Sequence, residues 1–325
     1  MDFTKRVQRR HVRFHEPGLP YHIISKTNNG AFFLAPKRGI RELCAGVIAK
    51  GQQKYPHLKL YGFAFMSNHI HLMVSGSSFD IPEFMGFVKR EISRRIGIKY
   101  ELKGPKWHKR YTSTALPTPE SQEECLRYIL SQGVKENLVA NSYHWPGLHC
   151  AKALLRGETL TGDWFNSTGY KIAKRNHERA KVKNGVRVRK GDFYESLPIK
   201  ISPILAWRSK SREACQKRIA AMLDDICKRA AKKRKLTGIK VLGVKKVIQS
   251  SISQRVTPSH PPWWQERRRQ ITAWAKLSDK LTQKYLQVYW AFQKRFRIAS
   301  EHLKTHKKFS FPLGAWSPPK YVSSN

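Results

Sequence analysis

Two histidines separated by one residue, His69 and His71, are the side chains of this sequence best placed to do chemistry. They lie in the segment Asn68-His-Ile-His-Leu-Met-Val74, where apolar residues alternate with them. This alternation predicts a β-strand with one buried face, so both imidazoles project together from the other face, their Cα atoms about 6–7 Å apart. Two imidazoles held in this way can share one divalent ion. The simpler alternative is two unrelated histidines near the start of a strand.

A second polar pair, Tyr128 and Gln132, lies further along the chain. The surrounding segment 125–133 is predicted to be helical, and residues four apart on a helix lie on one face. If this helix packs near the histidine strand, one surface gathers two imidazoles, an amide oxygen and a phenol. Imidazole suits several transition metals, and an amide oxygen also suits Mg²⁺ or Mn²⁺. The alternative is that Tyr128 packs at the edge of a core and Gln132 stands near a helix end.

This combination of groups would suit attack by a tyrosine on a phosphodiester. A metal at the phosphate polarises the P–O bond, and a phosphotyrosyl enzyme conserves the bond energy for a later rejoining step. A hydrolase would instead hold water with a cluster of carboxylates. No acidic residue falls within either segment. The pattern therefore favours strand transfer over hydrolysis.

The charge of the chain indicates the class of its partner. Its 325 residues include 63 Lys and Arg against 22 Asp and Glu, a formal net charge of +41. Such a surface binds polyanions, nucleic acid above all, because phosphate contacts release condensed counterions. An acidic membrane is the competing partner, but no basic amphipathic helix stands out and no apolar run approaches the roughly 18 residues of a membrane span.

The compartment is predicted from the cysteines and the N-terminus. Five cysteines, none in a CxxC pair, are typical of a reducing compartment, and the first residues lack the apolar run of a secretory signal. We therefore expect a cytoplasmic protein, associated with the nucleoid, that has no membrane partner.

Short strands and helices alternate in the first half of the chain. Apolar periodicity and turn residues predict four strands, at 21–26, 58–66, 69–75 and 107–115, and three helices, at 37–55, 81–99 and 119–134. This order predicts an α+β fold, a small antiparallel sheet with helices packed on it.

The second half is more basic and is predicted to be mainly helical. Residues 212–239 and 266–304 have helix-like patterns, and the segment between them is rich in proline. We divide the chain into a first domain at 1–165, a basic linker at 166–195 and a basic helical extension at 196–325.

The ordered set of motifs resembles the one-tyrosine HUH transposases, and most closely the REP-associated tyrosine transposases. The resemblance covers about residues 15–150. It rests on Tyr128 with a polar residue four positions on, and on the segments Pro17-Gly-Leu-Pro-Tyr-His22, Met66-Ser-Asn-His-Ile-His-Leu72 and Trp107-His-Lys-Arg-Tyr111.

The resemblance implies an HUH, ferredoxin-like fold and a role for each motif residue. It implies that His69 and His71 bind Mg²⁺ or Mn²⁺, that Tyr128 is the nucleophile and that Gln132 is the third metal ligand. Many REP-associated members have Asn at the last position, in a YIxxNP pattern. This chain has Gln132-Gly133, which keeps an amide oxygen but lengthens its reach.

The family's activity is metal-dependent cleavage and rejoining of single-stranded DNA that carries palindromic hairpins. Cleavage there leaves a 5′-phosphotyrosine and a free 3′-hydroxyl. Members occur as dimers and as monomers, so the resemblance allows a homodimer. Two alternatives stay open: a sequence-specific single-strand endonuclease that does not rejoin, and a non-catalytic basic nucleic-acid-binding protein with a decayed site.

Three groups of basic residues are predicted to contact DNA phosphates. One precedes the first strand, one lies on the polar side of the second helix, and one adjoins the fourth strand. A solvated surface is the alternative for each group. The residues are Arg9, Arg10 and Arg13, then Lys89, Arg90, Arg94 and Arg95, then Lys109 and Arg110.

Overall fold

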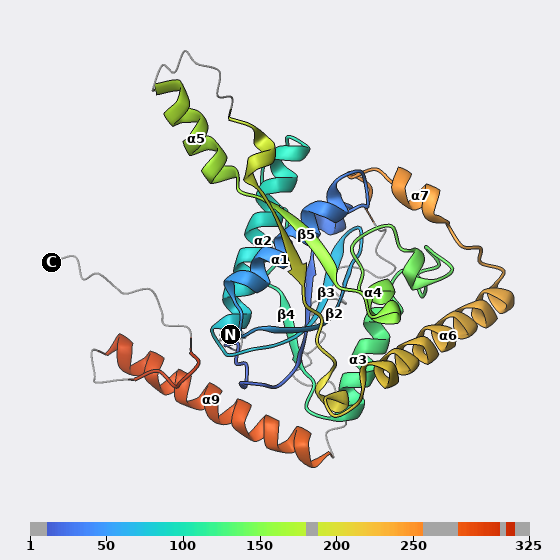
Figure 1. The fold of residues 1–325 in the computed structure, drawn as a ribbon. Coiled ribbons are helices and arrows are strands. Elements are labelled where there is room, and N and C mark those ends of the chain that lie inside the picture. The colour runs from blue at the N-terminus through green and yellow to red at the C-terminus, as the bar shows by residue number, and fades with distance from the viewer. Residues whose placement is uncertain (1–11, 180–187, 256–278, 306–309, 316–325) are drawn as a thin grey trace, which may run out of the picture.

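A four-stranded antiparallel sheet lies at the centre of the molecule, with the strand order β2-β3-β1-β4 (Figure 1). The computed structural model describes residues 12–179, 188–255, 279–305 and 310–315. The strands are β1 (Tyr21–Lys26), β2 (Lys59–Phe65), β3 (His69–Ser75) and β4 (Thr112–Ala115). The order of elements as far as the third helix is the predicted one, and the α+β fold is confirmed.

Helices cover both faces of this sheet. Helices α1 (Ile40–Lys54) and α2 (Asp80–Lys99) lie on one face and α3 (Pro119–Leu130) on the other (Figure 1). Gly62 of β2 is paired with Met73 of β3, and a Cβ at Gly62 would lie 3.1 Å from the Leu126 side chain of α3. Paired residues share a face, so the residues of β3 in step with Met73, including His69 and His71, face the side of α3.

The start and the end of α3 fix where the site residues lie. Thr118 caps the helix by accepting from the backbone N–H of Ser121, and the Ser121 hydroxyl accepts from the Thr118 N–H in return. The predicted helix 119–134 is too long, because the helix ends at Leu130 and Gly133 takes a φ of +83°. That left-handed conformation reverses the chain direction, as glycine commonly does after a helix.

The other predicted bounds need smaller corrections. The predicted strand 107–115 is regular only at its end, as β4, and Trp107 makes a single bridge to Thr27. Short 3₁₀ turns occur at Asn28–Gly30, Ser142–His144, Lys190–Phe193 and Leu205–Trp207.

A two-stranded hairpin packs on the outer side of α1. After α4 (Ala151–Arg156), strand β5 (Leu160–Phe165) pairs with β6 (Tyr194–Ile199), and α5 (Ser167–Arg179) extends away from the rest of the molecule (Figure 1). The range predicted as a basic linker, 166–195, thus contains α5 and the first residues of β6. The division of the chain into three parts stays a prediction.

The C-terminal part is mainly helical, as predicted, with α6 (Arg212–Thr237), α7 (Val244–Gln249) and α9 (Lys280–Lys304). The first part of the predicted helix 266–304 lies outside the described residues. Helix α9 packs on the segment before β1, where the rings of Phe14 and Phe292 lie 4.7 Å apart.

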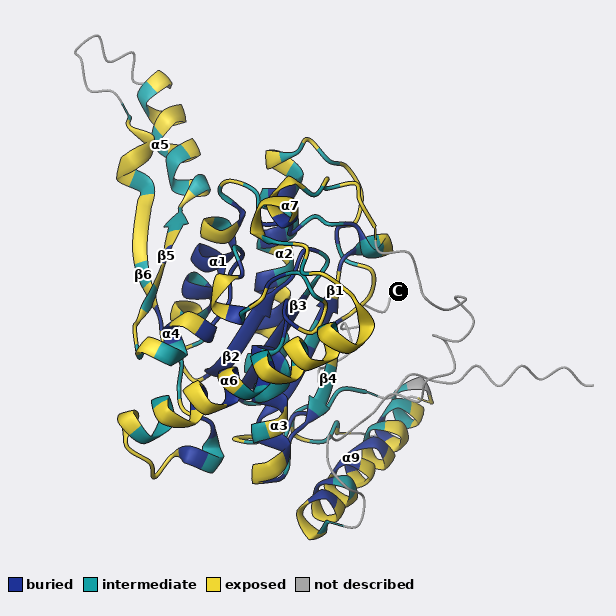
Figure 2. Ribbon diagram, turned by 90° about the vertical axis from the view of Figure 1, so that its right-hand side faces the viewer, coloured by how far each residue is buried: buried dark blue, intermediate teal, exposed yellow. Residues whose placement is uncertain are grey.

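Helix α6 runs beside α3 and is joined to it by an ion pair between Arg127 and Asp225, with 2.5 Å between nitrogen and oxygen. Figure 2 shows β1, β2 and β3 as largely buried, whereas α5 and α6 are largely exposed. Among the helices of the described residues, none has the length and apolar character needed to cross a membrane.

The contact between the hairpin and α1 depends on two glycines, which gives a test of this packing. A Cβ at Gly46 would collide with the backbone carbonyl of Asp163, and a Cβ at Gly162 with that of Ala45. We therefore expect Gly46→Ala to lower the free energy of unfolding by about 1–3 kcal/mol, as overpacking does, measured by urea denaturation.

Gly86→Ala is the matched control. Gly86 is also helical, but it is exposed and a Cβ there meets nothing within 4 Å. This substitution should raise stability by ~0.5–1 kcal/mol, because alanine is the better helix former. Equal effects of the two substitutions would contradict the described packing of the hairpin on α1.

Candidate functional site

The register of β1 and β3 brings a third histidine next to the predicted pair. His22 of β1 is paired with Met73 and Ile24 with His71, so His22 and His71 are diagonal neighbours on the face that α3 covers. Their rings stack at 5.1 Å between centroids, and His22 Nε2 lies 3.0 Å from His71 Nδ1. Both side chains are buried.

Each of the two predicted metal ligands on β3 is oriented through its Nδ1 atom. His71 Nδ1 faces His22, and His69 Nδ1 lies 2.7 Å from the side-chain oxygen of Asn68. With a proton on Nδ1, each histidine donates to this neighbour and keeps a lone pair on Nε2. Metal-binding histidines are commonly held by such a second hydrogen bond. His71 Nε2 is buried and has no hydrogen-bond partner among the described residues.

Gln132 lies in the turn after α3 and its side chain is fully buried. Its Nε2 donates to the backbone carbonyl of Tyr128 at 2.9 Å, which fixes the orientation of the carboxamide. Its Oε1 is buried and lacks a hydrogen-bond partner within the described part of the chain. The side chain is close enough to His69 to raise the pKa of that imidazole, against the larger lowering by burial.

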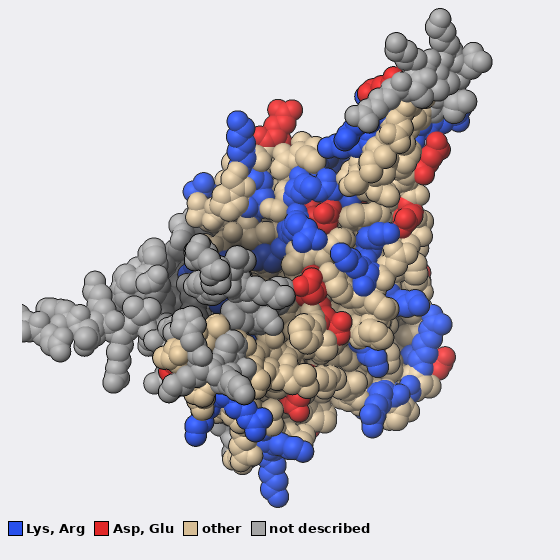
Figure 3. Space-filling model, turned by 90° about the vertical axis from the view of Figure 1, so that its left-hand side faces the viewer, with Lys and Arg blue, Asp and Glu red and all other residues tan. Residues whose placement is uncertain are grey.

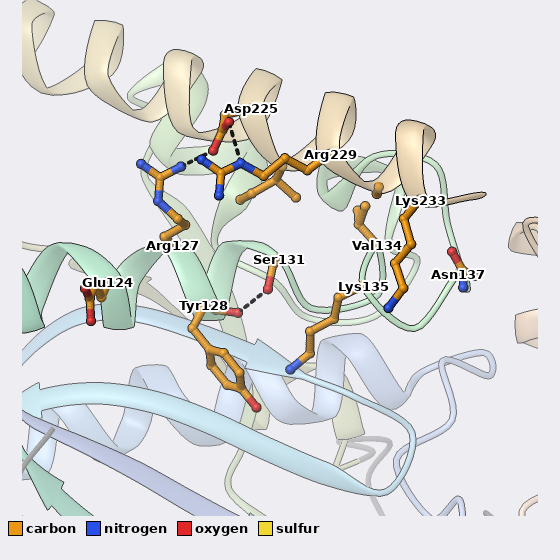
Figure 4. A pocket seen from close by; sticks show the side chains of 12 residues that line it. Glu124, Arg127, Tyr128, Ser131, Val134, Lys135, Asn137, Asp225, Arg229 and Lys233 are labelled. Atoms are coloured by element: carbon orange, nitrogen blue, oxygen red, sulfur yellow. Dashed lines mark hydrogen bonds and ion pairs between the residues drawn. The ribbon is translucent and has the colours of Figure 1, made fainter. Parts of the chain in front are cut away.

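Tyr128 reaches from α3 to the imidazoles. Its ring lies 5.4 Å from that of His71 and 5.7 Å from that of His22, edge to face in both cases. Figure 4 shows its hydroxyl pointing away from α6, toward the strands. The ammonium group of Lys135 lies over the ring, 3.6 Å from its centroid. Tyr128, Gln132 and the histidines therefore meet at one place, although the histidines precede Tyr128 by more than fifty residues in the sequence.

The imidazoles are neutral at physiological pH. Burial lowers the pKa of His22 to about 3 and that of His69 to about 4, and the pKa of His71 falls well below its usual 6.5. Lys135 lowers the pKa of all three further through its positive charge. Neutral imidazole is the form that binds a metal, so these side chains need not lose a proton at pH 7 to act as ligands.

The arrangement fits a divalent metal. Two buried atoms with lone pairs, His71 Nε2 and Gln132 Oε1, have no partner within the described ranges, and His69 adjoins both side chains. No group of three or more His, Cys, Asp or Glu side chains suited to hold a metal occurs among the described residues. The set here is instead two imidazoles and one carboxamide. Neutral ligands leave the charge of a divalent ion uncompensated, which favours an anionic substrate.

Some of the residues predicted to contact DNA lie near one another, because, beside the larger effect of burial, the charge of Arg13 lowers the pKa of Lys89 and that of Arg110 lowers the pKa of Arg13. The guanidinium of Arg13 lies 3.7 Å over the ring of Tyr111, and Lys89 donates to the backbone of Lys109 at 2.7 Å. Burial lowers the pKa of Lys89 to about 8. These two side chains are held within the fold.

The other residues predicted to contact DNA either form ion pairs within the protein or are exposed to solvent. Arg94 and Arg95 pair with Glu91, at 2.7 Å and 3.4 Å. Arg90, Lys109 and Arg110 are exposed, whereas Arg9 and Arg10 lie outside the described residues. DNA contact by these residues stays a prediction.

Two residues of the site, His22 and Lys135, were not predicted from the sequence. His22 alternates with buried residues in a strand, as His69 and His71 do, and this was the available signal. Its partner could not be read from the sequence, because strand register is a property of the folded sheet. Lys135 lies beyond the end of the helix, and only the turn at Gly133 brings it back over Tyr128.

Part of the chain matches a known protein family. Residues 17–132 match the family described as Transposase IS200 like. No match is found among the curated proteins. The match confirms, over these residues, the family resemblance predicted from the sequence, and it supports the prediction of a transposase.

Solved structures with a similar chain path include two transposase structures. A REP-associated tyrosine transposase bound to a REP hairpin is 18% identical with a TM-score of 0.38, over 46% of this chain and 86% of that chain. A crystal structure of a candidate transposase from Deinococcus radiodurans is 18% identical with a TM-score of 0.27, over 38% of this chain and 97% of that chain.

The lowered pKa values predict that acid destabilises the fold. An unfolded imidazole has a pKa of about 6.5, so below that pH the unfolded chain binds protons that the folded chain does not. Stability should therefore be greatest above about pH 6.5 and fall as the pH falls toward 4. The histidines concerned are His15, His22, His69, His71 and His149.

The measurement is the thermal unfolding midpoint between pH 7.5 and pH 5. His15→Gln is an informative variant, because His15 contacts Ser113 outside the site and its removal should make the pH dependence less steep. A midpoint that rises on acidification would show that these imidazoles are protonated in the folded protein.

Proposed function

Because residues 17–132 match the family of IS200-like transposases, we propose that this protein is a metal-dependent transposase that cleaves and rejoins single-stranded DNA through Tyr128. One observation carries the proposal: the Tyr128 ring contacts His71. Beside this contact lie two buried atoms that lack partners among the described residues, His71 Nε2 and Gln132 Oε1. The proposed nucleophile and the proposed metal ligands thus share one surface.

The proposed reaction is a transesterification. The Tyr128 oxygen forms a bond to phosphorus as the bond from phosphorus to the 3′ oxygen breaks, which leaves a 5′-phosphotyrosine. The phenol loses one proton and the departing 3′ oxygen gains one, so no water is consumed and a 3′-hydroxyl can reverse the step. Mg²⁺ or Mn²⁺ held by His69, His71 and Gln132 would polarise the phosphate and stabilise its developing charge.

The charges around the site suit a phosphate. Lys135 and Lys26 both act on the pKa values of His69 and His71, and no acidic side chain of the described residues contributes to the shift of either. We propose that Lys135, which lies over Tyr128, contributes to binding of the scissile phosphate. The proposed metal ligands include no carboxylate that could activate water, which favours joining over hydrolysis.

The substrate that we propose is single-stranded DNA with palindromic hairpins. This substrate class is taken from the family resemblance, and the charge of the chain supports it. Figure 3 shows Lys and Arg side chains scattered over one face of the molecule, where they outnumber Asp and Glu. The exposed Arg90, Lys109 and Arg110 are candidates for phosphate contacts. Action on chromosomal DNA would place the protein in the cytoplasm with the nucleoid.

One chain supplies every residue of the proposed site. Tyr128 and His71 of the same chain are in ring contact, so we propose cleavage in cis. A homodimer remains compatible with this proposal, but it is not needed to complete the site.

Replacement of Tyr128 by phenylalanine tests the nucleophile. The variant keeps the ring that packs on His71 and loses only the oxygen, so it should bind DNA normally and form no covalent adduct. The assay incubates the protein with Mg²⁺ and single-stranded DNA from the region that flanks its gene, and analyses peptide–nucleotide conjugates by mass spectrometry. An adduct that persists in Tyr128→Phe would assign the reaction to another residue.

Replacement of His22 tests the orientation of His71. His22→Ala should raise the Mn²⁺ concentration needed for half-maximal cleavage by about 10- to 100-fold, as loss of an outer hydrogen bond to a ligand does. His22→Gln retains an acceptor and should recover part of the loss. His71→Ala should abolish metal-dependent cleavage. Undiminished cleavage in His71→Ala would refute the metal site.

A further inference from the structure

A cavity of about 410 Å³ lies between α3 and α6, directly beside Tyr128 (Figure 4). Its α6 wall comes from residues 225–233, which follow the family domain by about ninety residues. The volume lies within the roughly 300–1,000 Å³ typical of small-molecule pockets. The family match therefore does not account for this cavity.

The cavity combines an apolar surface with a basic rim. Val134, Ile226 and Ala230 contribute apolar side chains to the lining. Four basic residues, Arg127, Lys135, Arg229 and Lys233, line the cavity as well, against two acidic residues, Glu124 and Asp225. An apolar surface with an excess of positive charge suits a ligand that is flat and apolar on its faces and anionic at its edge.

One ion-pair cluster holds the two helices at this cavity. Asp225 pairs with Arg127 of α3 at 2.5 Å and with Arg229 of its own helix at 2.8 Å. This leaves Lys135 and Lys233 as the rim cations outside the cluster; Lys135 has its own contact with Glu136 at 3.4 Å. In Figure 4 Lys233 points from α6 toward the turn after α3, whereas Lys135 points away from α6, toward the side chain of Tyr128.

The cavity is continuous with the proposed catalytic site through Tyr128. Tyr128 lines the cavity, and its ring contacts the imidazoles of His22 on β1 and His71 on β3. Lys135 lines the cavity and also lies over the Tyr128 ring. A strand whose phosphate reaches the Tyr128 hydroxyl would thus have its neighbouring nucleotide close to this cavity.

We propose that the cavity between α3 and α6 binds an unpaired nucleotide next to the cleaved phosphodiester of single-stranded DNA. This inference rests on the proposed function. The base packs on the apolar lining around Ala230 and Ile226, and Lys233 contacts a flanking phosphate. A duplex could not occupy the cavity in this way, because its bases are stacked and their faces are covered. The C-terminal extension then supplies part of the substrate site.

The test measures binding of fluorescein-labelled oligothymidylate by anisotropy, with the full chain carrying Tyr128→Phe so that no cleavage occurs. Ala230→Phe fills the cavity and should weaken binding about 5- to 100-fold, the range expected for loss of one base contact. Ala231→Phe is the matched control, because Ala231 is the next residue of α6, is exposed and does not line the cavity. It should change affinity less than about two-fold.

A second pair of variants tests the phosphate contact. Lys233→Ala should weaken binding and reduce the slope of log affinity against log salt by about 0.7, the value for one phosphate of a single strand. Lys232→Ala removes the same charge from an exposed position outside the cavity and should leave this slope nearly unchanged. Equal effects within either pair of variants would overturn the inference.

Two further measurements separate the inference from the proposed function. Binding of a blunt duplex should be unaffected by Ala230→Phe, and an equal loss for duplex would refute the assignment to an unpaired base. In the chain with Tyr128 intact, failure to form an adduct would refute the proposed function and the placement of the nucleotide next to a cleaved bond. The paired binding results would still report on the cavity itself.

Discussion

The contact between His22 and His71 is the constraint on which the site depends. The β1–β3 register places the two imidazoles 3.0 Å apart, buried and stacked. This leaves His71 only one nitrogen, Nε2, with which to meet a ligand. A one-residue slip of β1 would turn His22 to the opposite face of the sheet and leave His71 without this neighbour. The hydrophobic pattern of β1 therefore also determines the orientation of a polar side chain in the site.

The turn after α3 is the second element that the site requires. Gln132 donates to the Tyr128 carbonyl, and Gly133 reverses the chain so that Lys135 returns over the Tyr128 ring. The proposed nucleophile, the amide oxygen and the cation are thus held within one short segment. Their mutual geometry depends on local backbone conformation, whereas their distance from the histidines depends on the packing of α3 on the sheet.

The C-terminal part of the chain is built into the same structure. Trp207 is buried and donates to Glu123 of α3 at 2.6 Å, and Asp225 pairs with Arg127 of the same helix. Helix α3 is consequently fixed by the sheet on one side and by α6 on the other. A displacement of α6 would alter the surroundings of Tyr128, even though α6 lies outside residues 17–132, which match the transposase family.

The sequence by itself determined the order of the first seven elements, the family resemblance, and the strand and helix that carry His69, His71 and Tyr128. These features follow from local periodicity and spacing, which a single segment contains in full. Only the tertiary structure decided the end of α3 at Leu130, the partnership of His22 with His71, and the contacts of Arg13 with Tyr111 and of Arg95 with Trp164. Each of these depends on contacts between segments distant in sequence, or on the backbone conformation of one glycine, and neither is encoded in hydrophobic periodicity.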